Sequence, residues 1–187
     1  MKKLGVDIDG VLNNFHTAVS KVIKKQFHKD VDPTNYDLFK GIQISDSGRK
    51  AFLKDHMEQI NEETQLEWRV VEYLSRIQRE YEICIITARS YDIAKETIEW
   101  LNNNAIPYDD VYFNSGEKID VCQWLNTEWM IDDSPWNIRK LNKNKIKCMV
   151  FDQPYNSTVK ETEYTTRVSS WQEIYEILFH INNHVNN

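Results

Sequence analysis

Two carboxylates stand one residue apart near the start of the chain, in the segment Val6-Asp7-Ile8-Asp9-Gly10. This segment follows a short apolar run, so we expect it to lie at the end of a β-strand. Alternate residues of an extended chain point to the same side, which predicts that Asp7 and Asp9 crowd together. Like charges this close repel each other, and a cation or a shared proton relieves the repulsion. The pair therefore indicates a Mg²⁺ site that handles phosphate.

A second pair of carboxylates, Asp132 and Asp133, closes another apolar run. One acid, or the following Ser134, would be explained by capping the next helix at its N-terminus. That interpretation leaves the second acid without a role. The pair is therefore a second candidate for metal ligation.

Two other polar residues become candidates through their positions. Thr87 directly follows the apolar pair Ile85-Ile86, where its hydroxyl and the backbone N–H groups of Ala88 and Arg89 could donate to an anion. Taken alone, these residues are more simply the end of a strand and a surface cation. Lys118 precedes a predicted short helix, and a lysine by itself is usually solvated.

Apolar runs alternate with stretches of helical periodicity along most of the chain. The runs predict buried strands at residues 3–8, 82–87, 110–113, 128–132 and 147–151. Three sets of residues recur at helical spacing, the last after a capping box of Ser170 and Glu173: Val70, Leu74, Ile77 and Tyr81; Ala94, Thr97, Ile98 and Leu101; Trp171, Ile174, Tyr175 and Leu178. The alternation predicts an α/β fold, a Rossmann-like parallel sheet of about five strands flanked by helices.

The interval between residues 14 and 66 breaks this alternation. It carries no convincing strand pattern, and two sets of residues recur at helical spacing: Phe15, Val19, Val22 and Ile23; Phe52, His56, Met57 and Ile60. Ligands of open α/β sheets bind at the carboxyl ends of the strands, so an insertion after the first strand would cover the site. We predict a core of residues 1–13 and 67–187 and a helical cap of residues 14–66.

The bulk properties bound the function. The 187 residues carry a net charge of −6, which disfavours a broad face for duplex nucleic acid or a membrane surface. No apolar run approaches the roughly 18 residues of a membrane span. Cys84, Cys122 and Cys148 lie in apolar stretches without a C-x-x-C motif, which is typical of buried free thiols in the cytoplasm. The oligomeric state stays open between monomer and homodimer.

Taken together, the four motifs resemble those of the haloacid dehalogenase superfamily of phosphatases. The order is the same: D-x-D-G-x-L, a threonine after a strand, a lysine, and an acid pair after a strand. The helical insertion is similar to the family's C1-type cap. The chain is most similar to the 5'(3')-deoxyribonucleotidases and their bacterial nucleotidase relatives, through Phe15, Asn137 and the late segment Phe151-Asp-Gln-Pro-Tyr-Asn156.

The resemblance implies a Mg²⁺-dependent phosphomonoesterase that forms an aspartyl-phosphate on Asp7. Asp9 would protonate the leaving oxygen and then activate water. Mg²⁺ would bind Asp7, the backbone carbonyl of Asp9, and one or both of Asp132 and Asp133, with the deoxyribonucleotidase pattern favouring Asp133. Thr87 and Lys118, with the backbone at Ala88 and Arg89, would hold the phosphate oxygens.

The substrate is expected to be a small phosphate ester, with a nucleoside monophosphate as the first hypothesis. Phe15 either lines the base pocket or packs inside the first cap helix, whereas Tyr36, Phe39 and Trp68 are expected to pack. The five histidines show no metal-ligand spacing, so zinc is not expected. The alternatives are a phosphatase for another small ester, such as a sugar phosphate, and a noncatalytic nucleotide-binding regulator.

Overall fold

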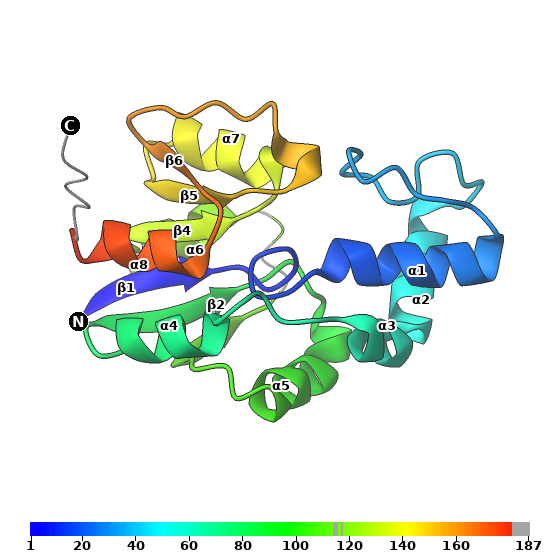
Figure 1. Cartoon of the computed structure of the whole chain (residues 1–187), viewed down its shortest axis with the longest axis horizontal. Coiled ribbons are helices and arrows are strands. Elements are labelled where there is room, and N and C mark those ends of the chain that lie inside the picture. The colour runs from blue at the N-terminus through cyan, green and yellow to red at the C-terminus, as the bar shows by residue number, and fades with distance from the viewer. Residues whose placement is uncertain (114–115, 117, 181–187) are drawn as a thin grey trace.

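A parallel sheet of six strands forms the centre of the computed structural model, which describes residues 1–113, 116 and 118–180 (Figure 1). The strand order is β3-β2-β1-β4-β5-β6, and every neighbouring pair is parallel. The strands are β1 (Lys2–Val6), β2 (Tyr81–Ile86), β3 (Asp110–Tyr112), β4 (Trp129–Asp132), β5 (Cys148–Phe151) and β6 (Thr165–Val168). Because the strands run in one direction, their carboxyl ends all meet at one edge of the sheet.

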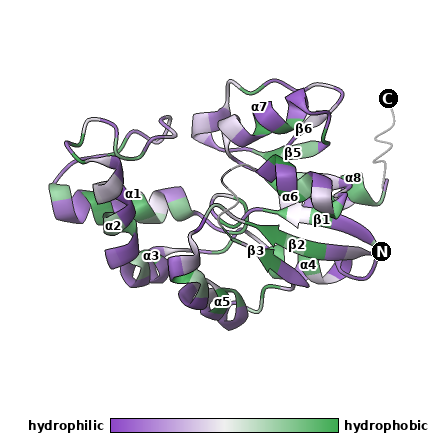
Figure 2. Ribbon diagram, turned by 180° about the vertical axis from the view of Figure 1, so that it is seen from behind, coloured by the Kyte–Doolittle hydropathy of each residue, from purple (hydrophilic) through white to green (hydrophobic). Residues whose placement is uncertain are grey.

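Helices cover both faces of the sheet, as an all-parallel sheet requires. One face packs against α4 (Val70–Ile77), α5 (Ala94–Asn103) and α8 (Trp171–Leu178). The other packs against α6 (Lys118–Leu125) and α7 (Pro135–Lys143). Short 3₁₀ turns, η1 (Tyr91–Ile93) and η2 (Pro154–Asn156), follow β2 and β5. Figure 2 shows that β2, in the middle of the structure, is largely hydrophobic.

The predicted α/β class, with a parallel sheet flanked by helices, is confirmed. The sixth strand, β6, lies beyond the prediction because Thr165-Thr-Arg-Val168 has no apolar run. The helical placement of Tyr81 is wrong, since this residue begins β2. The capping of α8 also differs in detail: Ser170 accepts from the Glu173 N–H at 3.2 Å, but the Glu173 carboxylate accepts from the N–H of Ser169.

The segment between residues 14 and 66 contains α1 (Phe15–Phe27), α2 (Asp46–Asp55) and α3 (Met57–Glu63). These helices lie together beyond one end of the sheet (Figure 1). They have a hydrophobic cluster of their own, built from Ala18, Val19, Val22, Ile23, Phe39, Phe52 and Ile60. A separate cluster means that most of the packing of these helices is internal to the segment.

The two ends of this helical segment are joined side by side. The backbone N–H of Asn14 donates to the Gln65 carbonyl at 3.0 Å, and the Asn14 side-chain oxygen accepts from the Gln65 N–H at 2.7 Å. The N–H of Glu67 donates to the Leu12 carbonyl at 2.9 Å. The chain therefore leaves the core and returns to it at two neighbouring backbone segments, which are hydrogen-bonded to each other.

Two bulk expectations are also met by the structure. All three cysteines, Cys84, Cys122 and Cys148, are buried and free. Within the described part of the chain, none of the helices has the length and apolar character needed to cross a membrane.

Candidate active site

The two acid pairs meet at the carboxyl edge of the sheet because β1 and β4 are neighbours. Val6 stands beside Ile131 in the register, and the Asp7 N–H donates to the Ile131 carbonyl at 3.0 Å. Asp7 follows the last residue of β1, and Asp132 is the last residue of β4. Parallel pairing therefore places two carboxylates that are 125 positions apart in the sequence next to each other.

Asp7, Asp132 and Asp133 form one buried carboxylate cluster. An oxygen atom from each lies within 4.8 Å of the other two. Their exposed fractions are 7%, 0% and 5%. Three carboxylates in so small a buried volume repel one another strongly, so the cluster must be balanced by positive charge or by protons.

Lys118 supplies one positive charge to the carboxylate cluster. It is the first residue of α6 and is 1% exposed, and its Nζ lies 2.7 Å from Asp7 Oδ2 and 2.9 Å from Asp132 Oδ2. Burial opposes the charged form of Lys118, but Asp132 and Asp7 outweigh burial and raise its pKa. Lys118 is therefore an ammonium ion that bridges the two acid pairs.

One lysine leaves the carboxylate cluster two charges short of balance. Burial, opposed in part by Lys118, raises the pKa of Asp7 to about 7, and burial with the charge of Asp132 raises the pKa of Asp133 well above its usual range. Both pKa shifts have the same physical cause, which is that a buried cluster of carboxylates opposes the ionisation of all its members. Oxygen ligands with a deficit of two charges match a divalent ion such as Mg²⁺.

The two acids of the second pair have different surroundings. Asp132 accepts from the Ser134 N–H at 2.8 Å and from the Asn137 amide at 3.0 Å, in addition to its contact with Lys118. The Asp133 side chain has one hydrogen bond within the described residues, from the Tyr155 hydroxyl to Oδ2. Asp133 therefore has more capacity left for a metal ion than Asp132 has.

Gly10 makes room for the Asp133 carboxylate. Its φ of +84° lies in the left-handed region, and a Cβ built on it would stand 2.2 Å from Asp133 Oδ2 and 2.7 Å from the Tyr155 hydroxyl. The Gly10 carbonyl accepts from the Gln153 side chain at 2.9 Å, which fixes the turn after β1. Both the conformation and the space at this position require glycine.

The segment after β2 brings three more candidate residues to the same edge. Thr87 is 1% exposed, and its hydroxyl oxygen accepts from the Arg89 N–H at 3.1 Å. Ala88 is exposed between its two buried neighbours. The Arg89 guanidinium turns to Asp9 and donates from Nε to Oδ2 at 2.9 Å and from NH2 to Oδ1 at 2.6 Å. Asp9 is thus held by Arg89, outside the buried carboxylate cluster.

Aromatic side chains from the helical segment reach the core beside this site. The His16 ring stacks on Tyr155 with centroids 4.4 Å apart, and Tyr36 meets Tyr155 edge-on at 5.5 Å. Phe15 is half-buried, with the Arg89 guanidinium 5.5 Å from its ring centroid. Phe39 packs inside the segment as expected, and Tyr36 packs edge-on against Tyr155 while staying 50% exposed. The expectation is wrong for Trp68, which is 66% exposed.

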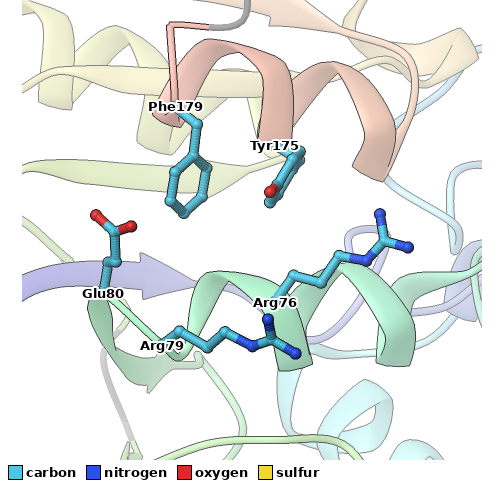
Figure 3. Close-up of a pocket in the computed structure, with 5 residues that line it drawn as sticks. All are labelled: Arg76, Arg79, Glu80, Tyr175 and Phe179. Carbon is cyan, nitrogen blue, oxygen red and sulfur yellow. The ribbon is translucent and has the colours of Figure 1, made fainter.

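A separate hollow of about 440 Å³ lies between α4 and α8. Its lining residues are Arg76, Arg79, Glu80, Tyr175 and Phe179 (Figure 3). Glu80 immediately precedes β2, whereas Thr87 follows the carboxyl end of that strand. The hollow therefore lies at the opposite edge of the sheet and is not part of the carboxylate site.

Comparison with known families fits this geometry. The family model described as 5' nucleotidase, deoxy (pyrimidine), cytosolic type C protein (NT5C) matches residues 1–184. The chain belongs to the NT5C family. It is therefore a phosphoric monoester hydrolase of the nucleotidase kind.

Relatives of the NT5C chain span nearly its whole length. A nucleotidase of Clostridium acetobutylicum, CA_C3379, is 23% identical over 92% of this chain and 91% of its own. A candidate 5'(3')-deoxyribonucleotidase of Chlorobaculum tepidum is 25% identical over 94% of this chain and 89% of its own. Among solved structures, the haloacid dehalogenase-like hydrolase SP0104 from Streptococcus pneumoniae has a TM-score of 0.66 at 14% identity, covering 97% of this chain and 99% of that one. The expected fold of the haloacid dehalogenase superfamily and the expected resemblance to nucleotidases are confirmed.

Two residues beside the carboxylate cluster were not among the site residues predicted from the sequence. Tyr155 holds Asp133, and Asn156 donates to the Asp133 carbonyl at 2.8 Å, yet both stand more than twenty positions away from it. Their signal is their place in η2, just after the carboxyl end of β5. Polar residues at that edge of a parallel sheet are site candidates whatever their local pattern.

Proposed function

We propose that the chain hydrolyses the 5'-monophosphates of nucleosides, with deoxypyrimidine nucleotides as the preferred class, through an aspartyl-phosphate on Asp7. The observation that carries the proposal is the buried cluster of Asp7, Asp132 and Asp133 bridged by Lys118. The family supports the choice of substrate, since its description names a deoxy and pyrimidine 5'-nucleotidase.

Mg²⁺ is the cofactor that fits the residues. We assign its ligands to the Asp7 carboxylate, the Asp9 backbone carbonyl and Asp133, with Asp132 supporting the site through Lys118 and Asn137. The preference for Asp133 rests on its single side-chain hydrogen bond within the described part of the chain. When bound, the ion offsets the negative cluster and polarises the phosphoryl group.

The chain's own residues account for the other parts of the reaction. Lys118 keeps Asp7 available as a carboxylate nucleophile and meets the non-bridging oxygens, together with the Thr87 hydroxyl. The exposed backbone at Ala88 offers its N–H group to the same oxygens, whereas the N–H of the buried Arg89 donates to Thr87. Asp9 gives a proton to the leaving oxygen and then takes one from the attacking water. Together these roles lower the activation free energy of phosphate ester hydrolysis, which is too high for any single group to overcome.

Residues 14–66 act as a cap over the site, and residues 1–13 and 67–187 act as the catalytic core. The proposal is supported by the separate hydrophobic cluster of the helical segment and by the contacts of His16 and Tyr36 with Tyr155. Phe15 is a candidate wall for the base. We further propose a cytoplasmic enzyme, monomer or homodimer, in keeping with three buried free thiols.

Phosphate release from a panel of nucleoside monophosphates and sugar phosphates tests the function. Activity should require Mg²⁺, vanish with EDTA, and favour deoxypyrimidine 5'-monophosphates. The variant Asp7→Asn should lose turnover while keeping the unfolding midpoint of the wild type. A preference for sugar phosphates would replace the substrate proposal, and full activity of Asp7→Asn would remove the nucleophile.

A further inference from the structure

Arg89 is the one arginine in the described part of the chain whose guanidinium is both buried and aimed at a candidate acid of the site. Its side chain is 4% exposed, and it forms a two-pronged contact with Asp9, from Nε to Oδ2 at 2.9 Å and from NH2 to Oδ1 at 2.6 Å. A planar guanidinium that meets both oxygens of a carboxylate fixes the direction of that carboxylate as well as its position.

The guanidinium is itself held on its other sides. NH1 donates to the Thr97 hydroxyl at 3.4 Å, and that hydroxyl donates in turn to the Ile93 carbonyl at 2.8 Å. The rings of Phe15 and Trp100 lie 5.5 Å and 5.9 Å from the guanidinium carbon. Phe15 is the first residue of α1, and Trp100 belongs to α5. The Arg89 guanidinium therefore contacts both the helical segment and the core.

This arrangement leaves Arg89 with little capacity for a phosphate group. Its guanidinium donates to Asp9 and Thr97, and its backbone N–H donates to Thr87. Its charge is balanced by a carboxylate 80 positions away in the sequence. We propose that Arg89 is a positioning residue, which aims the Asp9 carboxyl group at the leaving oxygen of the substrate.

The proposal rests on the proposed phosphomonoesterase function and adds a residue to it. As the bond between phosphorus and the leaving oxygen breaks, the bond between phosphorus and Asp7 forms, and the proton of the Asp9 carboxyl passes to the leaving oxygen. A protonated carboxyl group keeps one oxygen without hydrogen, which can go on accepting from Arg89 Nε while the other oxygen donates. Arg89 never touches the reacting atoms in this scheme.

Leaving-group dependence separates positioning of the acid from other roles. Benzyl phosphate and p-nitrophenyl phosphate have similar size, but the benzyl alkoxide needs a proton to leave and the nitrophenolate does not. The ratio kcat/KM reports the steps up to departure of the leaving group. We expect Arg89→Met to lower kcat/KM for benzyl phosphate about 100-fold and that for p-nitrophenyl phosphate less than about threefold, since general acids typically contribute about 10²–10⁴-fold.

The test includes a matched control and a double-mutant cycle. Arg69 is a second arginine with a two-pronged contact to a carboxylate, Glu72, and it also lies near two aromatic rings. Its partner Glu72 is not a candidate residue of the site, so Arg69→Met should leave both substrates unaffected. In an Asp9→Asn background, Arg89→Met should cause no additional loss with benzyl phosphate, because both changes remove the same action.

The outcomes distinguish this inference from the function on which it rests. If Asp9→Asn lowers both substrates equally, the acid role of Asp9 fails. Suppose instead that Asp9→Asn lowers kcat/KM mainly for benzyl phosphate. The role of Arg89 alone then fails if Arg89→Met lowers kcat/KM equally for both substrates, or if it adds a loss in the Asp9→Asn background. Should Arg89→Met not fold, Arg89→Lys keeps the charge without the two-pronged geometry. An unchanged ratio of the two substrates in Arg89→Lys would overturn the proposal.

Discussion

Replacement of Gly10 by alanine tests the geometry of the carboxylate site most directly. The left-handed φ of +84° costs an alanine about 1–2 kcal/mol. The new Cβ would also stand 2.2 Å from Asp133 Oδ2 and 2.7 Å from Asp133 Cγ, in a region that is already packed. Overpacking of this kind costs about 1–3 kcal/mol. We expect a total destabilisation of about 2–5 kcal/mol, within the stability range of a folded domain.

Gly41 provides the matched control for this measurement. It has a similar φ of +80°, but a Cβ built on it meets no atom within 4 Å. Gly41→Ala should therefore cost only the conformational term of about 1–2 kcal/mol. Urea unfolding of both variants, followed by tryptophan fluorescence, isolates the steric term as the difference between them.

Gly10→Ala should also weaken the response to Mg²⁺. A normal contact between carbon and oxygen requires Asp133 to move by about 1 Å, and a misplacement of that size costs roughly 100-fold in rate. Titration of phosphatase activity with MgCl₂ measures this effect, and Gly41→Ala should titrate like the wild type. Equal stabilities for the two variants, with equal Mg²⁺ titrations, would refute the assignment of Asp133 to the metal site.

Three other predictions follow from buried groups. Lys118→Met should destabilise the metal-free protein by about 3–5 kcal/mol because it leaves buried carboxylates unpaired, and MgCl₂ should recover part of this loss in urea unfolding. Burial lowers the pKa of His16 below 6.5, so the native state takes up its proton less readily than the unfolded state. The free energy of unfolding should therefore contain a contribution that is lost as the pH falls below about 6.5, and His16→Gln should remove this part of the pH dependence. Burial raises the pKa values of Cys84, Cys122 and Cys148 to about 11, so a disulfide reagent should label them slowly in the native protein and rapidly in urea; fast native labelling would contradict their burial.

Local pattern was sufficient to predict the fold class and the principal acids. Asp7 and Asp132 each follow or close an apolar strand, and β1 and β4 turn out to be neighbours, so their proximity follows from parallel pairing alone. The strand β6 was beyond reach because an edge strand needs few apolar residues, and Thr165-Thr-Arg-Val168 has a single one.

Partners that depend on tertiary contacts could not be predicted. Arg89 appeared to be an ordinary cation after a strand, and only the folded chain shows that Asp9 is its partner. Tyr155 was visible as part of a familiar segment, but its contact with Asp133 depends on how η2 follows β5. Side-chain direction across 22 or 80 positions of sequence is decided by packing, which residue spacing does not encode.

The joined ends of the segment from residue 14 to residue 66 have an evolutionary consequence. Because Asn14 and Gln65 are hydrogen-bonded neighbours, the residues between them form an insertion whose two ends are adjacent. A change in the length of this insertion need not alter the sheet. Such a cassette can be shortened, lengthened or exchanged as a unit while the two attachment points stay fixed. In the proposed role of residues 14–66 as a cap, selection can thus change the substrate that reaches the site without altering the catalytic core.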